Sequence, residues 1–204
     1  MLLPLRKTSP LLATLFLLAT AWPVLAQTTE GKWSVPAKHN NTQRALTWSA
    51  TAPLLGKATA YSVNFFCDPI TTRQASGALG FDLTVADAVK LKPFDFEAFE
   101  GPDATAGGKK LLQASIERSG KPALTFRTAV SGGSTDGSNF AFSATDLSRE
   151  ANSTAKSILR ALGDGAQVLK ITITDSRNAK LKLEFNVPVA GKEADFKALL
   201  AGLK

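Results

Sequence analysis

The sequence predicts a mainly β protein, an antiparallel β-sandwich with one or two short helices near the C-terminus. Three observations lead to this fold class. Apolar and polar residues alternate with a period of two through most of the chain after residue 26, as expected where one face of a strand packs on a core and the other faces water. Residues that favour turns separate these segments, and helical spacing is confined to two late segments.

The early strands are recognised by their alternation and by the turns between them. Residues 60–67 are the clearest example, because Tyr61, Val63, Phe65 and Cys67 fall on one face of a strand. The other strands expected before the C-terminal third lie at residues 45–49, 78–85, 93–99, 111–117, 123–130 and 139–142. Two of these, 111–117 and 123–130, form a hairpin through residues 118–122, and the glycine-rich residues 132–138 form a connecting loop.

The C-terminal third gives the strongest strand pattern. Apolar and polar residues alternate in residues 168–174 and again in residues 180–187. The segment between them begins with Asp175 and contains Asn178, and such side chains hydrogen-bond the backbone of their own turn. An antiparallel hairpin is therefore expected here.

Two helices are expected late in the chain. Asp146 or Ser148 is placed to cap a helix that runs through residues 149–162 and ends at Gly163. The second helix spans residues 193–203 and places Phe196, Leu199, Leu200 and Leu203 at helical spacing, so this stripe should dock onto a sheet.

The first 26 residues have the pattern of a cleavable secretory signal peptide. Arg6 and Lys7 precede an apolar run at residues 11–19, and Val24-Leu25-Ala26 offers small residues to a signal peptidase. The run is too short to cross a bilayer, and Gln27 offers no cysteine for a lipid anchor. We expect a single β-rich domain at residues 27–204, soluble and either periplasmic or secreted, with no transmembrane segment after cleavage.

The charge and the numbers of cysteine and histidine argue against several classes of function for this chain. Without residues 1–26 the chain has 22 Lys and Arg against 17 Asp and Glu, a net charge of +5, and its cations are dispersed. Nucleic-acid binding is therefore not expected. Cys67 is the only cysteine and His39 the only histidine, so we expect no cofactor and no metal site. Cys67 is read as a small buried hydrophobe, with a reactive thiol or an intermolecular disulfide as the alternatives.

The most enzyme-like feature is the acidic pair Asp95 and Glu97. In a strand these carboxylates would point the same way, roughly 6.5–7 Å apart, a separation that suits a glycosidase. Phe94 and Phe96 would occupy the opposite face, so the pattern is also that of an amphipathic strand with its charges in water. Asp95 and Glu97 are thus weak catalytic candidates. The loop at residues 132–138 lacks the final glycine of a nucleophile elbow and the ending of a phosphate loop.

The end of the chain resembles a known family. After the hairpin, Phe185-Asn186-Val187-Pro188-Val189-Ala190-Gly191 leads into a short helix that contains Ala194, Phe196, Ala198 and Leu199. This arrangement is similar to the closing pattern of the invasion-associated locus B proteins and related bacterial periplasmic domains of unknown function. The resemblance implies an exported β-sandwich that acts through its surface, and it supplies no functional residues. The single cysteine departs from many such proteins, which carry more.

These observations leave three hypotheses of function. The first is an exported, non-catalytic protein that binds a protein partner or a component of the cell envelope, because no nucleophile and base or metal and ligand set is recognisable. The second is a carbohydrate-active hydrolase that uses Asp95 and Glu97. The third is a carrier that holds a small apolar ligand between its sheets.

Overall fold

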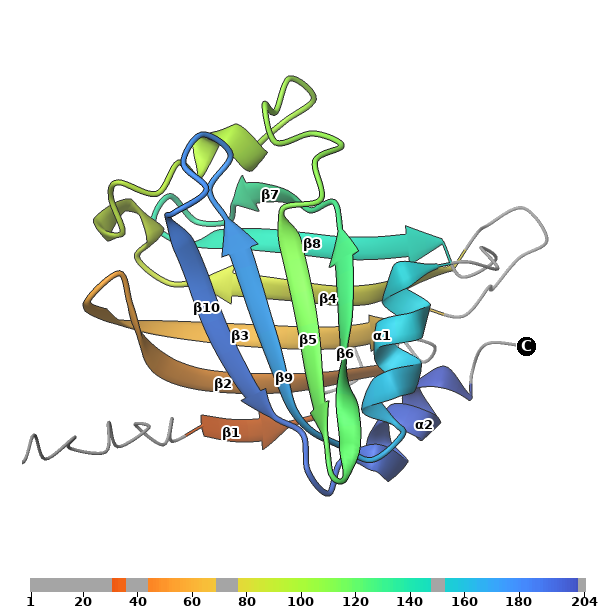
Figure 1. Ribbon diagram of the computed structural model, residues 1–204. Coiled ribbons are helices and arrows are strands. Elements are labelled where there is room, and N and C mark those ends of the chain that lie inside the picture. The colour runs from red at the N-terminus through yellow and green to blue at the C-terminus, as the bar shows by residue number, and fades with distance from the viewer. Residues whose placement is uncertain (1–30, 36–43, 69–76, 148–152, 202–204) are drawn as a thin grey trace, which may run out of the picture.

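The computed structural model describes residues 31–35, 44–68, 77–147 and 153–201, which form two antiparallel β-sheets packed face to face (Figure 1). The larger sheet has the strand order β1-β2-β3-β4-β8-β7 and the smaller has the order β10-β9-β5-β6. In Figure 1 the strands of one sheet cross those of the other at a steep angle, as in orthogonal sheet packing. The mainly β, antiparallel fold class predicted from the sequence is confirmed.

Eight of the ten strands in the described residues overlap segments that were predicted as strands, and some, such as β2 and β8, run several residues further. The strands of the larger sheet are β1 (Gly31–Ser34), β2 (Arg44–Leu54), β3 (Lys57–Cys67), β4 (Ala78–Val85), β7 (Ser131–Ser134) and β8 (Phe140–Leu147). Those of the smaller sheet are β5 (Leu112–Arg118), β6 (Lys121–Thr128), β9 (Ala166–Thr174) and β10 (Lys182–Pro188). The short strands β1 and β7, at the two edges of the larger sheet, were not predicted, and β7 corrects the start of the segment 132–138 that was predicted as a loop.

The predicted C-terminal hairpin is confirmed. β9 and β10 pair antiparallel, and buried residues meet across the ladder, with Phe185 opposite Ile171 and Leu183 opposite Ile173. The Asp175 carboxylate accepts hydrogen bonds from the backbone N–H groups of Arg177 and Asn178, at 2.9 and 2.8 Å. The expected turn chemistry therefore holds this hairpin.

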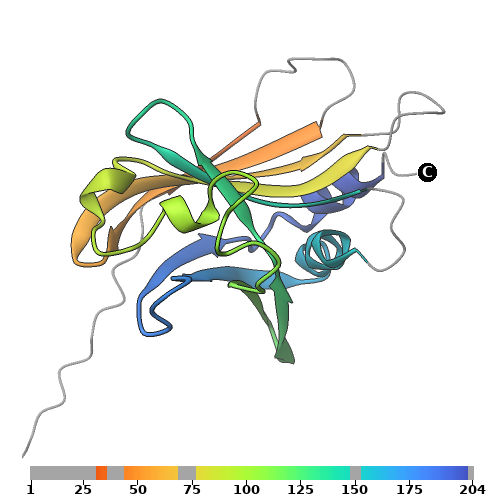
Figure 2. The ribbon, with the colours of Figure 1, turned by 90° about the horizontal axis from the view of Figure 1, so that it is seen from above.

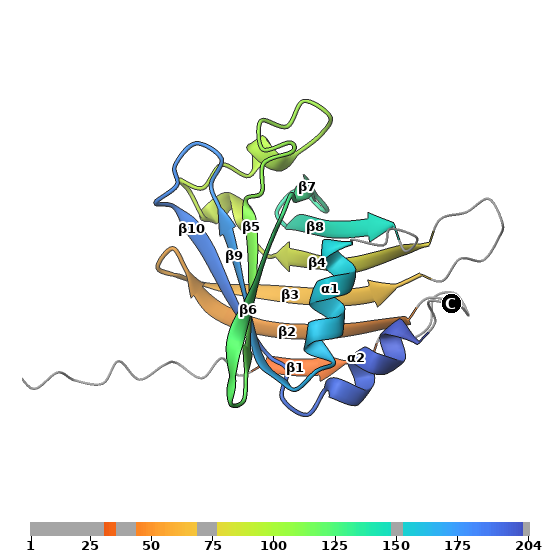
Figure 3. The same cartoon turned by 45° about the vertical axis from the view of Figure 1, so that its right-hand side comes forward.

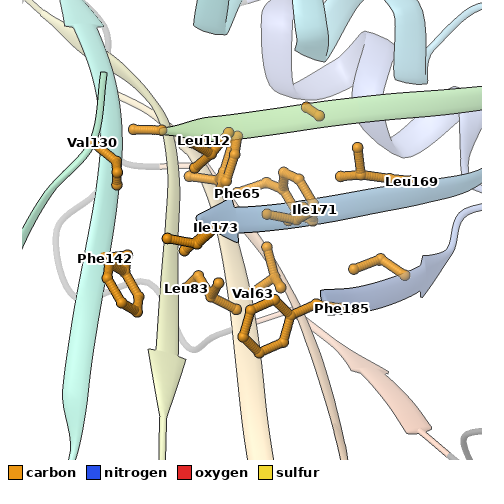
Figure 4. Packing of buried hydrophobic residues seen from close by; sticks show 14 of the residues in the cluster. Val63, Phe65, Leu83, Leu112, Val130, Phe142, Leu169, Ile171, Ile173 and Phe185 are labelled. Carbon is orange, nitrogen blue, oxygen red and sulfur yellow. The ribbon is translucent and has the colours of Figure 1, made fainter. Parts of the chain in front are cut away.

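The core lies between the two sheets. Side chains from the larger sheet, among them Val63, Phe65 and Leu83, point toward Ile171 and Phe185 of the smaller sheet (Figure 4). All five are 0–1% exposed. Cys67 is buried at the end of the face that β3 turns inward, as predicted for a small hydrophobe. Side chains therefore fill the space between the sheets.

Two helices close one side of the sandwich (Figures 2 and 3). Helix α1 (Thr154–Leu162) contacts β4, β8 and β6, and α2 (Glu193–Leu200) lies against β2 and β3. Ser153 caps α1 by accepting a hydrogen bond from Lys156 N at 2.9 Å. The Asp146 carboxylate accepts from Ser153 Oγ and from Ala155 N, both at 2.8 Å.

These helices agree in part with the predicted ones. Gly163 ends α1 as expected, and Asp146 takes part in its capping, but Ser153 is the N-cap residue. Ser148 and residues 149–152 of the predicted helix lie outside the described residues, as does Leu203. Phe196 and Leu199 of α2 are buried against the sheet, as predicted.

The helix α2 contributes to a group of packed rings that we call the Trp cluster: Trp33, Trp48, Phe65 and Phe196. Ring centroids lie 5.5 Å apart for Trp33 and Trp48 and 5.1 Å apart for Phe65 and Phe196. Phe196 comes from α2, whereas the other three rings come from β1, β2 and β3. This cluster therefore joins the helix to the edge of the larger sheet.

The outer edge of β10 is covered by side chains from the larger sheet. Trp33 Nε1 donates to the Pro188 carbonyl at 3.0 Å, and the Tyr61 hydroxyl donates to the Asn186 carbonyl at 2.6 Å. Strand edges otherwise present such backbone groups to solvent. Burial raises the pKa of the Tyr61 phenol.

Residues 93–99 do not form the predicted strand. They lie in turns and in a short 3-10 helix, η2 (Glu97–Phe99), within the connection from β4 to β5. An earlier 3-10 helix, η1 (Ala88–Lys90), belongs to the same connection. Phe94, Ala98 and Phe99 are buried while Glu97 is exposed. The apolar residues thus follow the geometry of turns and a 3-10 helix, and the apparent period of two is coincidental.

Candidate binding pocket

A pocket of about 550 Å³ lies at one end of the sandwich, among loops. Three segments surround it: the connection from β4 to β5, the β7–β8 hairpin and the turn between β9 and β10. Figure 1 shows these segments gathered above the strands of the larger sheet. A parallel β-bridge between Glu100 and Gly132 joins the first two segments. We call this cavity the loop-end pocket.

One side of the loop-end pocket is aromatic. Phe94, Phe96 and Phe140 line it, with ring centroids 4.9 Å apart for Phe94 and Phe96 and 5.1 Å apart for Phe96 and Phe140. Phe94 and Phe140 are buried, whereas Phe96 is half-buried. Together with Phe99 and Phe142 behind them, these rings form what we call the Phe cluster. The pocket is therefore an opening onto one end of the hydrophobic core.

Asp175 fixes the β9–β10 turn to the wall of the pocket. This residue is only 4% exposed. Its Oδ2 accepts a hydrogen bond from Asp95 N at 2.7 Å, while Oδ1 holds its own turn. Three N–H donors thus compensate the burial of one carboxylate. The bond links residues 80 positions apart in the chain.

Asp95 lines the pocket but is engaged by the fold. Its Oδ1 accepts from Ala98 N at 3.3 Å, at the start of η2, and its Oδ2 lies 3.0 Å from Nε of Arg177. Arg177 is itself largely exposed and also lines the pocket. The ion pair with Asp95 therefore brings the Arg177 guanidinium to the rim of the pocket.

Glu97 and Glu100 lie at the opposite ends of η2, and both line the pocket. Within the part of the chain that the structure describes, the Glu97 carboxylate forms no hydrogen bond or ion pair. Glu100 Oε1 accepts from Ser134 N at 3.2 Å, and no described residue bonds its second oxygen. Both side chains are exposed. The two sequence candidates, Asp95 and Glu97, thus share one pocket, although they do not share the face of a strand.

Sequence reasoning missed Glu100, Arg177 and the β7–β8 hairpin as parts of this pocket. The pair Gly132-Gly133 was a usable signal, because glycine marks close approach in a strand. A Cβ atom on Gly132 would lie 2.3 Å from the Phe140 ring. Glycine at this position lets β7 pack directly on an aromatic wall of the pocket.

A second hollow lies on the outer face of the larger sheet. It is bigger, about 680 Å³, but it is shallow and is lined by small residues such as Ser49, Ser62 and Thr84. Asp82 lies on the same face, and burial raises the pKa of its carboxyl group, an effect that a hydrogen bond with Ser143 opposes. No set of charged and aromatic groups converges there comparable to that in the loop-end pocket, so we place the candidate site in the pocket.

The remaining candidates add no chemistry to the pocket. His39 lies outside the described residues. In the described ranges, no three His, Cys, Asp or Glu side chains come together as a metal site. The same ranges contain no helix of the length and apolarity that a membrane span requires.

Comparisons with known proteins add no information about the site beyond its geometry. No protein-family model, curated protein or solved structure matches this chain.

Proposed function

We propose that this chain is an exported, non-catalytic binding protein and that the loop-end pocket is its binding site. The observation that carries the proposal is the combination of groups in the pocket. An aromatic wall that continues into the core faces charged side chains that the fold does not fully use. Ligand sites in proteins typically pair an apolar lining with a few convergent polar groups, in cavities of about 300–1,000 Å³.

The construction of the pocket supports binding without large rearrangement. Asp175 and Glu100 each accept a hydrogen bond from a backbone N–H in another segment of the wall, and Asp95 accepts one within its own segment. A site held in this way loses little conformational entropy when a ligand enters, and this favours affinity. The pocket therefore acts as a preformed receptor.

The two alternative functions have less support. A glycosidase would use Asp95 and Glu97, but one Asp95 oxygen accepts a hydrogen bond from Ala98 N and the other forms an ion pair with Arg177, which favours the ionised carboxylate over a general acid. A carrier with its ligand between the sheets would have to displace side chains that already fill that space, such as Val63 and Ile171. Neither alternative uses the convergence of charges at the rim.

Export and a periplasmic or secreted location form part of the proposal. They rest on the pattern of residues 1–26 and on the resemblance to the invasion-associated locus B proteins. The β9–β10 hairpin followed by α2 has the arrangement on which that resemblance depends. The intact mass of the protein recovered from its native envelope tests this part, because cleavage after Ala26 leaves residues 27–204.

Native mass spectrometry of the mature protein, purified gently from its own envelope fraction, tests the binding function. We expect a small molecule to remain bound to the wild type and to be lost from Phe96→Ala. Thr172→Ala, on the outer face of β9, is the matched control and should keep it. Circular dichroism checks that each variant folds. If all three proteins retain the same molecule, or none retains any, the loop-end pocket is not the binding site.

A further inference from the structure

The charges around the loop-end pocket have both signs, and this narrows the class of ligand. The inference rests on the proposed binding function. Glu97 and Glu100 supply carboxylates at the two ends of η2, while Arg177 supplies a guanidinium from the β9–β10 turn and Lys92 an ammonium group from the connection before η2. Phe96 lines the pocket together with these groups. The pocket thus offers an anionic group, a cationic group and an aromatic surface.

Each of these charged groups has unused bonding capacity. Only Nε of Arg177 pairs with Asp95, which leaves the terminal nitrogens of the guanidinium without a bonded partner among the described side chains. A guanidinium fork matches a carboxylate through two parallel hydrogen bonds. Glu97 and the second oxygen of Glu100 are acceptors for an ammonium group. Asp95 is the ion-pair partner of Arg177.

Ligands of a single charge fit these groups poorly. A phosphate-rich ligand would bring negative charge to Glu97 and Glu100, and like charges repel. A ligand with only a cation would leave the Arg177 fork unpaired. A neutral lipid would cover both signs of charge without satisfying either, and desolvated charged groups that stay unpaired are costly.

We propose that the loop-end pocket binds a short apolar peptide through both of its free termini. The terminal carboxylate pairs with Arg177, the terminal ammonium pairs with Glu97 and Glu100, and an apolar side chain packs on Phe96. A single free amino acid carries the same pair of charges, but the volume of about 550 Å³ favours an occupant larger than one residue.

Isothermal titration calorimetry of the mature protein with the dipeptide of two leucines tests this assignment. The matched ligands are the same dipeptide acetylated at its N-terminus, the same dipeptide amidated at its C-terminus, and free leucine. We expect each blocked dipeptide to bind at least about tenfold more weakly, because each loses a hydrogen-bonded charge pair. Free leucine should bind more weakly than the dipeptide.

Variants assign each terminus to its partner. Arg177→Gln should weaken binding of the free dipeptide about tenfold and leave binding of the amidated dipeptide unchanged. Glu97→Gln should weaken binding of the free dipeptide about tenfold and leave binding of the acetylated dipeptide unchanged. Lys182→Gln, on the outer face of β10, is the control and should change neither. Equal binding of free and blocked dipeptides would overturn the inference.

These experiments distinguish a wrong ligand class from a wrong assignment of the binding site. If no dipeptide binds but another molecule is retained in a Phe96-dependent manner, the peptide assignment is wrong and the binding function stands. If neither occurs, both are overturned. Tighter binding of free leucine than of the dipeptide would replace the peptide with a single amino acid.

Discussion

The Trp cluster and the Phe cluster are built from the same kind of side chain but end in different ways. In the Trp cluster, Phe196 comes from helix α2 and is buried together with Trp48 and Phe65, while Trp33 at the sheet edge is half-buried. In the Phe cluster, the outermost ring, Phe96, sits on a loop and stays half-exposed to a pocket. One end of the core is closed by secondary structure and the other by polar bonds between loops.

Aromatic residues therefore serve two purposes in this core: they stabilise the fold at one end and line a pocket at the other. Rings beneath a helix act mainly through apolar packing, and their removal should cost stability. At the loop end, the loops that carry the rings are joined by hydrogen bonds to carboxylates, such as the bond from Asp95 N to Asp175. Such contacts leave room for a cavity that apolar packing would have filled. The comparison therefore predicts that stability and binding depend on opposite ends of the sandwich.

The largest expected effect comes from the same substitution made in each cluster. Phe65→Ala should lower the free energy of unfolding by about 3–5 kcal/mol, because Phe65 is fully buried between the sheets. Phe96→Ala should cost only about 1 kcal/mol, because its ring is half-buried. Urea denaturation measures both values. Equal costs would remove the distinction between a sealed end and an open end.

A glycine in contact with each cluster allows a finer test. A Cβ atom on Gly31 would lie 2.0 Å from the Trp48 ring, and one on Gly132 would lie 2.3 Å from the Phe140 ring. Gly31→Ala and Gly132→Ala should each cost about 1–3 kcal/mol through overpacking. Only Gly132→Ala should also weaken ligand binding, since Phe140 lines the pocket. A matching loss of binding in Gly31→Ala would show that the two ends are coupled.

Tyr61 provides a pH-dependent test beside the sealed end. Tyr61→Phe removes the hydrogen bond to the Asn186 carbonyl and should cost about 1 kcal/mol at neutral pH. Burial raises the pKa of this phenol, so the folded state holds the proton more tightly than the unfolded state. That stabilisation is complete below pH 10.0, the ordinary pKa, and declines as pH rises toward the folded value.

The measurement is helped by the composition, since Tyr61 is the only tyrosine. Phenolate absorbance therefore titrates this one group, and its midpoint should lie above pH 10.0. Alkaline unfolding curves of the wild type and of Tyr61→Phe should converge as pH rises past that value. Parallel curves across the whole range would show that burial of Tyr61 does not shift its titration.

The smallest effect is expected at Asp82, which belongs to neither cluster. Burial raises the pKa of Asp82, so its ionised form destabilises the folded state at neutral pH. Asp82→Asn should raise the melting temperature at pH 7, and the gain should vanish below pH 3.8, where the carboxyl group is protonated in both states. Scanning calorimetry at pH 7 and pH 3 measures this difference. A gain of the same size at both pH values would exclude the electrostatic cause.

Local patterns were enough to predict most of the fold. The β9–β10 hairpin was predictable because alternation and the Asp175 turn agree, and both act within a few residues. Strand β1 was not predictable from its own residues, Gly31-Lys32-Trp33-Ser34, because it forms through pairing with β2, where Trp33 lies opposite Trp48. Tertiary contacts override weak local preferences at such edges.

The candidate site was predictable only in part. Asp95 and Glu97 were singled out and do line the pocket, but the strand assigned to them was wrong. The spacing of Asp95 and Ala98 was a local signal for the start of a 3-10 helix, since a side chain three residues back can cap such a start. Arg177 and Glu100 reach the pocket through long-range folding, and no periodicity in the sequence places them together.

The capped edge of β10 bears on how this protein behaves at high concentration. A neighbouring molecule that tried to extend the smaller sheet on that side would meet carbonyls already bonded to Trp33 and Tyr61. It would have to displace an indole and a phenol before a ladder formed. The opposite edge of that sheet is β6, and self-association by strand addition should begin there more readily than at the partly covered β10 edge.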